Sequence, residues 1–298
     1  MGCFVRTTPP RRIFTAVLAV LCLGLASPAG AQGRVECAAV KSALLGRSVR
    51  YCAILPPGYD VAQATRFPIL YYLHGLGENE QTLAGPLWNV VDNLREAGKV
   101  GNFLIVTPDG DRSFYINSRD GRVRYEDFFI REFMPAIERK YRILARRASR
   151  GIAGTSMGGY GALRFAFKYP QLFAAVTAHM PALYEKFPQQ FMALLVQGGR
   201  STVAPFGQPF DEAFWERNTP FTLARENAAG LHTLKIYLDC GSEDDYGFDS
   251  GTKRLDEELT GLHLKHEAHI YPGRHDAFFV AAHIGEALAF QSRALTAK

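Results

Sequence analysis

Short hydrophobic runs alternate along the chain with longer amphipathic stretches. The short runs are rich in β-branched and aromatic residues and predict buried strands at 67–73, 102–107, 151–153, 173–178, 234–240 and 266–271. The amphipathic stretches have helical spacing and predict helices at 87–97, 125–141, 160–168, 250–261 and 277–294. This alternation predicts an α/β fold with a mostly parallel central sheet and helices on both of its faces.

Residues 184–231 interrupt the alternation. They are rich in proline, glycine and aromatic residues, among them Phe206, Phe214 and Trp215. We therefore expect a cap-like insertion over the carboxyl edge of the sheet. Since no repeat or low-complexity linker divides the chain, residues 32–298 are expected to form a single domain.

The first 31 residues have the pattern of a secretory signal peptide. Arg11 and Arg12 precede an apolar stretch at 13–26, and Ala29-Gly30-Ala31 is an A-x-A cleavage site. The stretch is shorter than the roughly 20 residues that span a bilayer, although an uncleaved anchor is the alternative. We expect cleavage after Ala31, a secreted or periplasmic mature protein, and no stable membrane insertion.

The alternation of strands and helices also does not hold before the first predicted parallel strand, where residues 35–42 and 47–55 predict a β-hairpin. Cys37 and Cys52 are equally far from its centre and could face each other across the ladder. Exported proteins retain disulfides, so a bridge between these two cysteines is the prediction, with Cys240 left free. The alternative is that all three are small buried hydrophobic residues, with a bulge at Gly46 that shifts the register.

Composition and charge exclude several classes of protein. With 298 residues, of which 47% are hydrophobic, the chain can bury one large core, which excludes a disordered chain and a small disulfide scaffold. The formal net charge is +5, but Arg6, Arg11 and Arg12 lie in the predicted signal peptide. The remaining charge is too balanced for a nucleic-acid surface.

The strongest chemical signal is the pentapeptide Gly154-Thr155-Ser156-Met157-Gly158. It follows a predicted strand and precedes a predicted helix, which is the context of the G-x-S-x-G nucleophile elbow. In such an elbow the serine adopts strained backbone angles at a sharp turn, and the glycines allow neighbouring elements to approach. A glycine-rich turn without chemistry is the alternative; the context favours Ser156 as a nucleophile.

A serine nucleophile needs a base and an acid that orients the base. In this chain order both follow the serine, and His275 lies in a turn between the last predicted strand and the last predicted helix. His179 could line the pocket, but a structural role fits it better. The acid is expected just after the strand at 234–240, where Asp244 and Asp245 both qualify. The oxyanion hole is expected to use the main-chain N–H groups of Met157 and of the loop at 74–77, with Leu76 as the donor.

These residues belong to a wider set of motifs: L-P-P-G-Y at 55–59, Y-L-H-G-L-G at 72–77, Y-E-D at 125–127, G-T-S-M-G-G-Y-G-A at 154–162 and P-G-R-H-D at 272–276. Together they resemble the putative esterase family of the α/β-hydrolase superfamily. That family includes S-formylglutathione hydrolases, feruloyl and acetyl xylan esterases, enterochelin esterases and secreted mycolyltransferases. The similarity extends from about Val49 to the end of the chain.

The resemblance implies an α/β-hydrolase fold, and its Gly-x-x-Asp pattern at 241–244 implies Asp244 as the acid. It also implies Leu76 and Met157 as oxyanion donors, and no metal or organic cofactor. The expected function is hydrolysis of carboxylic esters, on small acyl or aryl substrates or on carbohydrate-linked ones. Two alternatives are acyl transfer by the same triad and a non-catalytic carbohydrate-binding module on the same fold. Neither a nucleic-acid partner nor an oligomeric state is predicted.

Overall fold

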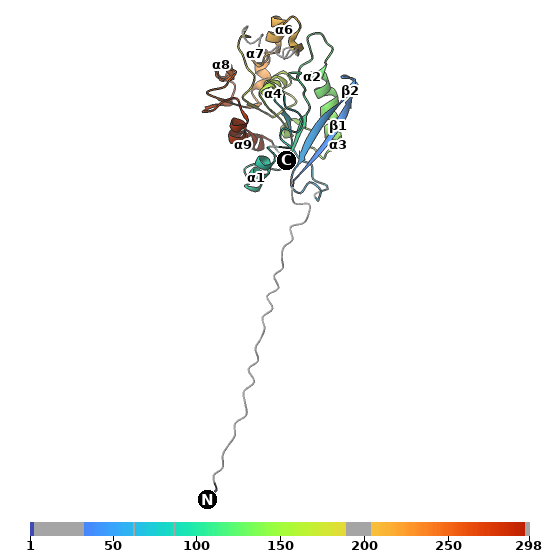
Figure 1. Cartoon of the computed structure of the whole chain (residues 1–298), viewed down its shortest axis with the longest axis vertical. Helices are drawn as coiled ribbons and strands as arrows, with labels where there is room; N and C mark the ends of the chain where they lie inside the picture. Colours follow the sequence, from blue (N-terminus) through green and yellow to red (C-terminus); the bar gives the residue numbers. More distant parts are fainter. Residues whose placement is uncertain (3–32, 62, 86, 189–203, 296–298) are drawn as a thin grey trace.

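An eight-stranded sheet runs through the described part of the chain (Figure 1). The computed structural model describes residues 1–2, 33–61, 63–85, 87–188 and 204–295. The predicted signal peptide, apart from its first two residues, and positions 189–203 of the predicted insertion lie outside this part. The strands are β1 Arg34–Ser42, β2 Arg47–Leu55, β3 Ile69–Leu73, β4 Leu104–Pro108, β5 Arg150–Thr155, β6 Ala175–His179, β7 Lys235–Gly241 and β8 His266–Tyr271.

The strand order is β1-β2-β4-β3-β5-β6-β7-β8. Strand β2 pairs antiparallel with both β1 and β4, and all the other pairs are parallel. Strands β3, β4 and β6 are buried along their whole length, because helices cover both faces of the sheet. This explains why the sequence shows them as continuous apolar runs. The mostly parallel sheet with an N-terminal antiparallel hairpin confirms the predicted fold class.

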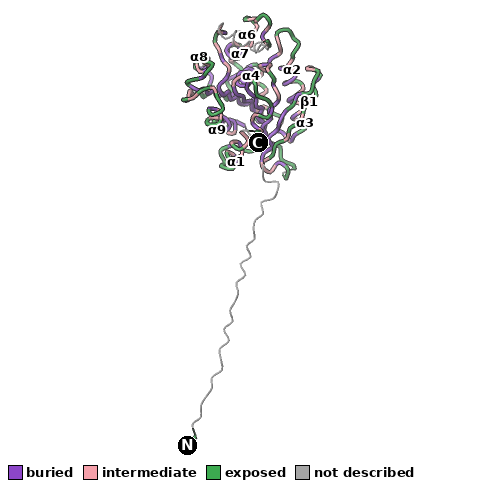
Figure 2. Tube along the Cα trace, viewed as in Figure 1, coloured by how far each residue is buried: buried purple, intermediate pink, exposed green. Residues whose placement is uncertain are grey.

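Helices form a layer on each side of the sheet. On one side, α1 (Trp88–Glu96) and α9 (Ala277–Ala294) share a core cluster with β3 and β4. The larger cluster on the other side joins the sheet to α2 (Tyr125–Phe128), η1 (Phe129–Phe133), α3 (Met134–Lys140), α4 (Met157–Lys168), α7 (Pro220–Leu231) and α8 (Phe248–Gly261). Figure 2 shows the resulting buried interior inside a largely exposed outer shell. Two further short elements, η2 (Arg147–Ser149) and η4 (Ala204–Phe206), and the helix α6 (Glu212–Asn218) complete the description.

The predicted helix at 125–141 contains a π-helical turn that the pattern does not indicate. Elements α2, η1 and α3 follow one another without a break, and η1 has the wider π geometry. The consecutive side chains of Phe128 and Phe129 are both fully buried, together with that of Phe133. A π turn inserts one residue into the helical repeat, which lets adjacent side chains share the buried face.

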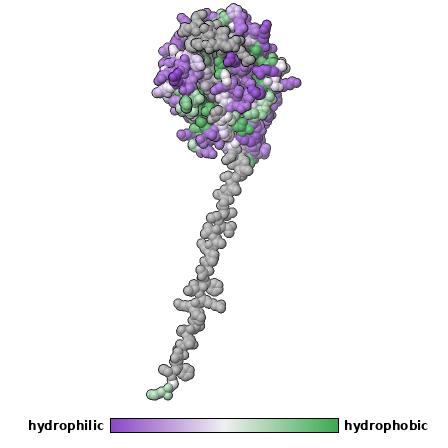
Figure 3. Space-filling model, viewed as in Figure 1, coloured by the Kyte–Doolittle hydropathy of each residue, from purple (hydrophilic) through white to green (hydrophobic). Residues whose placement is uncertain are grey.

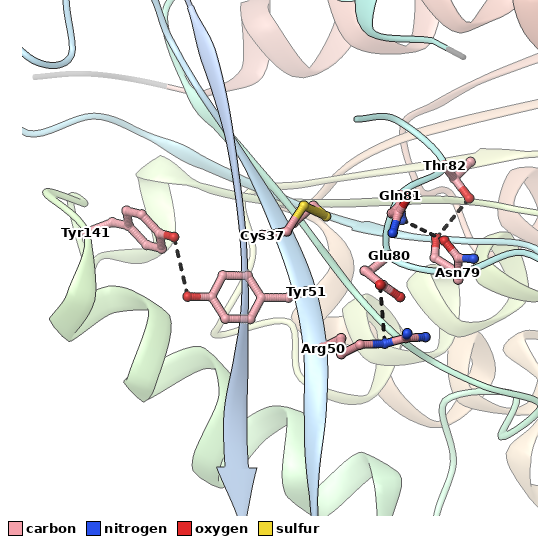
Figure 4. Close-up of a disulfide and its surroundings, with 9 residues drawn as sticks. Cys37, Arg50, Tyr51, Asn79, Glu80, Gln81, Thr82 and Tyr141 are labelled. Carbon is pink, nitrogen blue, oxygen red and sulfur yellow. Dashed lines mark hydrogen bonds and ion pairs between the residues drawn. A yellow bond between two sulfur atoms is a disulfide. The ribbon is translucent and has the colours of Figure 1, made fainter. Parts of the chain in front are cut away.

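The hairpin pairs Cys37 directly with Cys52, and the two form a disulfide (Figure 4). Close to it, the hydroxyls of Tyr51 and Tyr141 lie 3.3 Å apart and connect β2 to the end of α3. The turn leaves the strands in register because Gly46 adopts a positive φ of 63° without a bulge in the ladder. Cys240 is buried and unpaired, as expected from the sequence.

The predicted insertion divides into two parts. Its last element, α7, packs against α4 and joins the helical layer over the sheet, which the sequence pattern did not indicate. The remaining described residues of the predicted cap, 184–188 and 204–219, contain an aromatic cluster in which Phe210 contacts Phe187, Phe206 and Trp215, and Phe187 also contacts Trp215. This aromatic cluster explains why the segment is rich in large apolar residues without being a strand or a long helix.

The face of the molecule shown in Figure 3 is mainly hydrophilic. On the face shown in Figure 3, hydrophobic residues form small separate patches. No helix in the described ranges combines the length and the apolar character needed to cross a membrane.

Candidate active site

The predicted chemical residues meet at the carboxyl edge of the sheet. Strand β3 lies between β4 and β5, so the chain first turns to one side of β3 and then to the other. Such a reversal opens a crevice beyond the carboxyl ends of the strands. The loop 74–77 follows β3, Ser156 follows β5, Asp244 follows β7 and His275 follows β8.

Ser156 occupies a strained turn between β5 and α4. Its φ and ψ are 55° and −117°, a conformation that a non-glycine residue rarely adopts. A Cβ on Gly158 would lie 1.9 Å from the carbonyl oxygen of Leu73, and one on Gly154 would lie 2.3 Å from the backbone of Gly158. The two glycines are therefore required by the close approach of β3, β5 and α4.

The side chains of Ser156, His275 and Asp244 form a continuous hydrogen-bonded relay. His275 Nε2 lies 3.0 Å from Ser156 Oγ, and His275 Nδ1 lies 2.7 Å from Asp244 Oδ2. The carboxylate can only accept, so Nδ1–H donates to Asp244 and Nε2 is free to accept from the serine hydroxyl. This arrangement can remove a proton from Ser156.

The environment of Asp244 keeps it ionised. Burial by itself would raise the pKa of Asp244, but the hydrogen bond from His275 and two main-chain N–H groups outweigh it. Those N–H groups belong to Tyr246 and Phe248 and donate to Oδ1 at 2.9 and 3.2 Å. The pKa of Asp244 consequently lies below its ordinary value.

Asp245 has a different environment, although it is the next residue. Its side chain is about one-third exposed and pairs with Arg274. Its Oδ2 accepts the main-chain N–H of His275 at 3.2 Å, so it holds the loop that carries the histidine. The geometry thus places Asp244 against the imidazole and Asp245 against the backbone, a distinction that residue order alone left open.

The loop after β3 is held next to Ser156 by His74. This buried side chain accepts the N–H of Gly110 at Nε2 and donates from Nδ1 to the carbonyl of Gly75, both at 2.8 Å. In the described part of the chain, the main-chain N–H groups of Leu76 and Met157 have no acceptor. Met157 is the first residue of α4, where N–H groups have no partner inside the helix. These two groups are therefore available to a ligand oxygen.

Three other histidines that follow Ser156 in the chain have side-chain partners away from its hydroxyl. His179 is buried beside Asp239, and His266 Nε2 lies 2.6 Å from Asp256. His283 stacks on Tyr271 with ring centroids 4.2 Å apart. No cluster of three or more acidic, cysteine or histidine side chains suited to a metal ion occurs in the described ranges.

Sequence reasoning missed the residues that surround His275. Tyr246 and Phe248 contact the imidazole edge-on, with centroids 4.9 and 5.3 Å away. Cys240 Sγ lies 3.5 Å from Asp244 Oδ2 and can donate a weak hydrogen bond to it. A cysteine four residues before the acid and two aromatics just after it were the only sequence signals for these contacts.

The matching family model and two curated relatives of this chain all carry the name esterase. The family model described as Putative esterase matches residues 42–287. Esterase Rv1288 of Mycobacterium tuberculosis is 30% identical over 245 residues, which cover 74% of this chain and 51% of the relative. An endo-1,4-beta-xylanase/feruloyl esterase of Xylanibacter ruminicola is 32% identical over 127 residues, or 40% of this chain and 18% of that protein. The chain thus spans about half the length of the mycobacterial relative.

Solved structures share the fold over nearly the whole chain. A ferulic acid esterase superposes with a TM-score of 0.76 at 24% identity and covers 89% of this chain and 99% of its own. The fluorophosphonate-binding serine hydrolase F of Staphylococcus aureus gives a TM-score of 0.73 at 21% identity, with 88% and 99% covered. An S-formylglutathione hydrolase of Agrobacterium tumefaciens gives 0.70 at 19% identity, with 89% and 97% covered. At these identities the likeness establishes the α/β-hydrolase fold.

Proposed function

The chain belongs to the putative esterase family, and from this premise we propose that it is a serine hydrolase of carboxylic esters that acts through Ser156, His275 and Asp244. The observation that carries the proposal is the relay from Ser156 Oγ through the imidazole to a fully buried carboxylate. The order of the three residues along the chain, and the position of Ser156 between a strand and a helix at the sheet edge, are those expected of an α/β-hydrolase triad with a nucleophile elbow.

In the proposed mechanism Ser156 Oγ attacks the acyl carbon while His275 Nε2 takes its proton. The C–O bond to the alcohol then breaks, and the same nitrogen returns the proton to the leaving oxygen, which gives an acyl-enzyme. Water attacks this intermediate with His275 again as the base, and the acid product leaves with Ser156 restored. Asp244 fixes the tautomer of His275 and stabilises the imidazolium that forms in each half-reaction.

The negative charge that develops on the carbonyl oxygen is assigned to the N–H groups of Leu76 and Met157. Loss of one such donor costs roughly 3–4 kcal/mol of transition-state stabilisation in serine hydrolases. The position of Met157 at the start of α4, a helix of 12 residues, adds the partial positive charge of a helix N-terminus.

Esters of small acyl or aryl acids, including those linked to carbohydrate, are the proposed substrates. Relatives named feruloyl esterase and ferulic acid esterase support an aryl ester. The predicted signal peptide and the disulfide support export to the periplasm or the medium, where glutathione thioesters are not abundant.

Acyl transfer is the second candidate, because an acyl-enzyme can react with an acceptor hydroxyl in place of water. The observation in its favour is the aromatic cluster of the predicted cap, which packs through Phe206 on Tyr160 of α4, the helix that follows Ser156; a segment anchored there could exclude water from the site. A comparison of product ratios with and without a carbohydrate acceptor separates the two. A ratio that no acceptor changes supports hydrolysis.

The proposal is tested with the purified protein and its Ser156→Ala variant on p-nitrophenyl acetate, butyrate and octanoate, methyl ferulate and acetylated xylan. We expect turnover that disappears in the variant, together with fluorophosphonate labelling of the unaltered protein only. A near-normal rate in Ser156→Ala would reject Ser156 as the nucleophile. Absence of both turnover and labelling in the unaltered protein would favour the non-catalytic binding module.

A further inference from the structure

A groove of about 590 Å³ lies between residues 184–188 and the first half of α8, outside the triad. Its aromatic lining comes from Tyr184 and Tyr246. Its charged lining consists of Glu185, Lys186, Lys253, Arg254 and Glu257. Apart from the main-chain N–H of Tyr246, which donates to Asp244, these residues have no role in the mechanism proposed above.

Tyr246 links the groove to the catalytic imidazole, because it lines the groove and contacts His275. The ring of Tyr246 is perpendicular to that of His275, at a centroid distance of 4.9 Å, and 48% of the tyrosine is exposed. The hydroxyl of Tyr184 donates to the main-chain oxygen of Tyr246 at 2.9 Å and fixes the two aromatic residues relative to each other. One wall of the groove therefore contains the residue that packs against His275.

The chemistry of the triad determines which part of an ester lies on this side. His275 Nε2 must give its proton to the leaving oxygen, so that oxygen must come within hydrogen-bond distance of Nε2. The alcohol of the ester consequently leaves the site beside the imidazole. On the other side of the nucleophile, the loop 74–77 and the start of α4 hold the carbonyl oxygen.

The lining of the groove has three cations, Lys186, Lys253 and Arg254, and two anions, Glu185 and Glu257. Arg254 pairs with both anions, at 2.9 and 3.2 Å, and Lys253 pairs at 2.8 Å with Asp249, which lies beside the groove. With Asp249 included the charges sum to zero, so the groove has no strong preference for an anion or a cation. An alkyl chain would cover these charged groups without giving them hydrogen bonds, which is unfavourable.

We infer that this groove is the binding site for the alcohol part of the ester, and that it takes a neutral, hydroxyl-rich alcohol such as an oligosaccharide. The hydroxyl groups of a sugar can replace water at the charged side chains, while its C–H face packs on the tyrosine rings. The inference rests on the proposed ester hydrolysis and assigns the substrate class of that same site.

The test uses a variant that fills the groove at a distance from the triad. Ser250 is exposed on the first turn of α8 and lines the groove, whereas Thr260 is exposed on the last turn and does not. The substrates are the methyl, octyl and arabinoxylan-trisaccharide esters of ferulate, or the corresponding acetates if the enzyme prefers that acyl group. The readout is the ratio of kcat/KM for each longer ester to that for the methyl ester.

We expect Ser250→Trp to lower the trisaccharide-to-methyl ratio by about ten-fold or more, mainly through KM, because binding of the remote part of the substrate is lost. The octyl-to-methyl ratio should stay within about two-fold, and Thr260→Trp should change neither ratio beyond that. An unchanged trisaccharide ratio in Ser250→Trp would overturn the inference and leave the esterase intact. An equal fall for the octyl ester would overturn the preference for a polyol. Failure of the proposed ester hydrolysis mechanism would be seen in a separate experiment, as turnover that persists in Ser156→Ala.

Discussion

Two histidine–aspartate pairs lie at the carboxyl edge of the sheet on neighbouring strands, and only one of them reaches Ser156, the proposed nucleophile. In the first, His275 Nδ1 lies 2.7 Å from Asp244 Oδ2. In the second, His179 Nδ1 lies 2.5 Å from Asp239 Oδ1, at the ends of β6 and β7. The two pairs have the same residue types and similar distances, but only the first has the geometry of a hydrogen bond.

They differ in what surrounds the other nitrogen of the imidazole. His275 Nε2 lies 3.0 Å from Ser156 Oγ, and the side chain is 11% exposed, so a substrate can reach it. The ring of His179 is buried against that of Phe279. Only the main chain of His179 meets Ser156: its carbonyl oxygen accepts the N–H of Ser156 at 2.9 Å. A carboxylate-bound histidine is therefore a base only where its second nitrogen meets both a nucleophile and an open site. The same pair in the core is a structural contact.

The largest effect that this comparison predicts is on catalysis at His275. We expect His275→Ala to lower kcat on an aryl ester by about 10⁴-fold or more, since the base is lost. His179→Ala should lower kcat of the folded protein by less than about ten-fold, because its ring has no contact with the hydroxyl of Ser156. Steady-state kinetics with active-site titration measures both. Equal losses in the two variants would mean that the buried pair takes part in the reaction.

The second prediction concerns the two adjacent aspartates after β7. Asp244→Asn should lower kcat by roughly 10³–10⁴-fold, because the wrong tautomer of the imidazole is then favoured. Asp245→Asn loses an exposed ion pair with Arg274 and one hydrogen bond to the backbone of His275, and should cost less than about ten-fold. The same kinetic assay applies, and the opposite ranking would move the acid by one residue.

The sequence predicted the parts of this site that depend on local order. The glycine pattern around Ser156 is dictated by close approach of backbones, and the turn before α9 places His275 at the sheet edge, so both follow from short segments. The strand and helix pattern also follows, because a buried parallel strand must be apolar on both faces.

The rest depends on contacts between distant segments. Whether Asp244 or Asp245 reaches the imidazole is decided by main-chain N–H groups and by Arg274, which residue order does not reveal. The partner of His179 lies on β7, a strand sixty residues away in the chain, so its structural role could be expected but not its contact with Asp239. The π turn at η1 likewise results from packing of Phe128 and Phe129 against the sheet, which helical periodicity cannot express.

The third prediction is that the buried pair matters for stability. Asp239 is fully buried and His179 nearly so, and removal of one partner leaves the other without compensation in the core. His179→Ala should therefore lower the free energy of unfolding by about 3–5 kcal/mol. Asp245→Asn is the matched control, because loss of an exposed ion pair changes the free energy of unfolding little. Urea titration followed by circular dichroism measures both, and equal stabilities would show that the core tolerates the unpaired group.

The smallest expected effect is the dependence of protein stability on pH and salt, which should differ between the Asp244→Asn and Asp245→Asn variants. The pKa of each carboxyl lies below the ordinary 3.8. For Asp244, burial raises the pKa, but the hydrogen bond from His275 and two main-chain N–H groups lower it by more. For Asp245, the hydrogen bond from Arg274 is the main cause of the lowered pKa. A depressed pKa in the folded state contributes stability above pH 3.8 that is lost as the pH falls through the lower folded value. The stability advantage of the unaltered protein over Asp244→Asn should thus be present at pH 7 and shrink below pH 4.

Salt distinguishes the origins of the two contributions, since exposed ion pairs are screened and buried hydrogen bonds much less so. In 1 M NaCl at pH 7 we expect the advantage over Asp245→Asn to disappear and the advantage over Asp244→Asn to persist. Thermal unfolding of the three proteins from pH 3 to pH 7, at low and high salt, measures this. An advantage over Asp244→Asn that is independent of pH would mean that it does not come from the ionised carboxylate. In that case the charge of the buried acid would serve catalysis alone, in contrast to the core pair of His179 and Asp239.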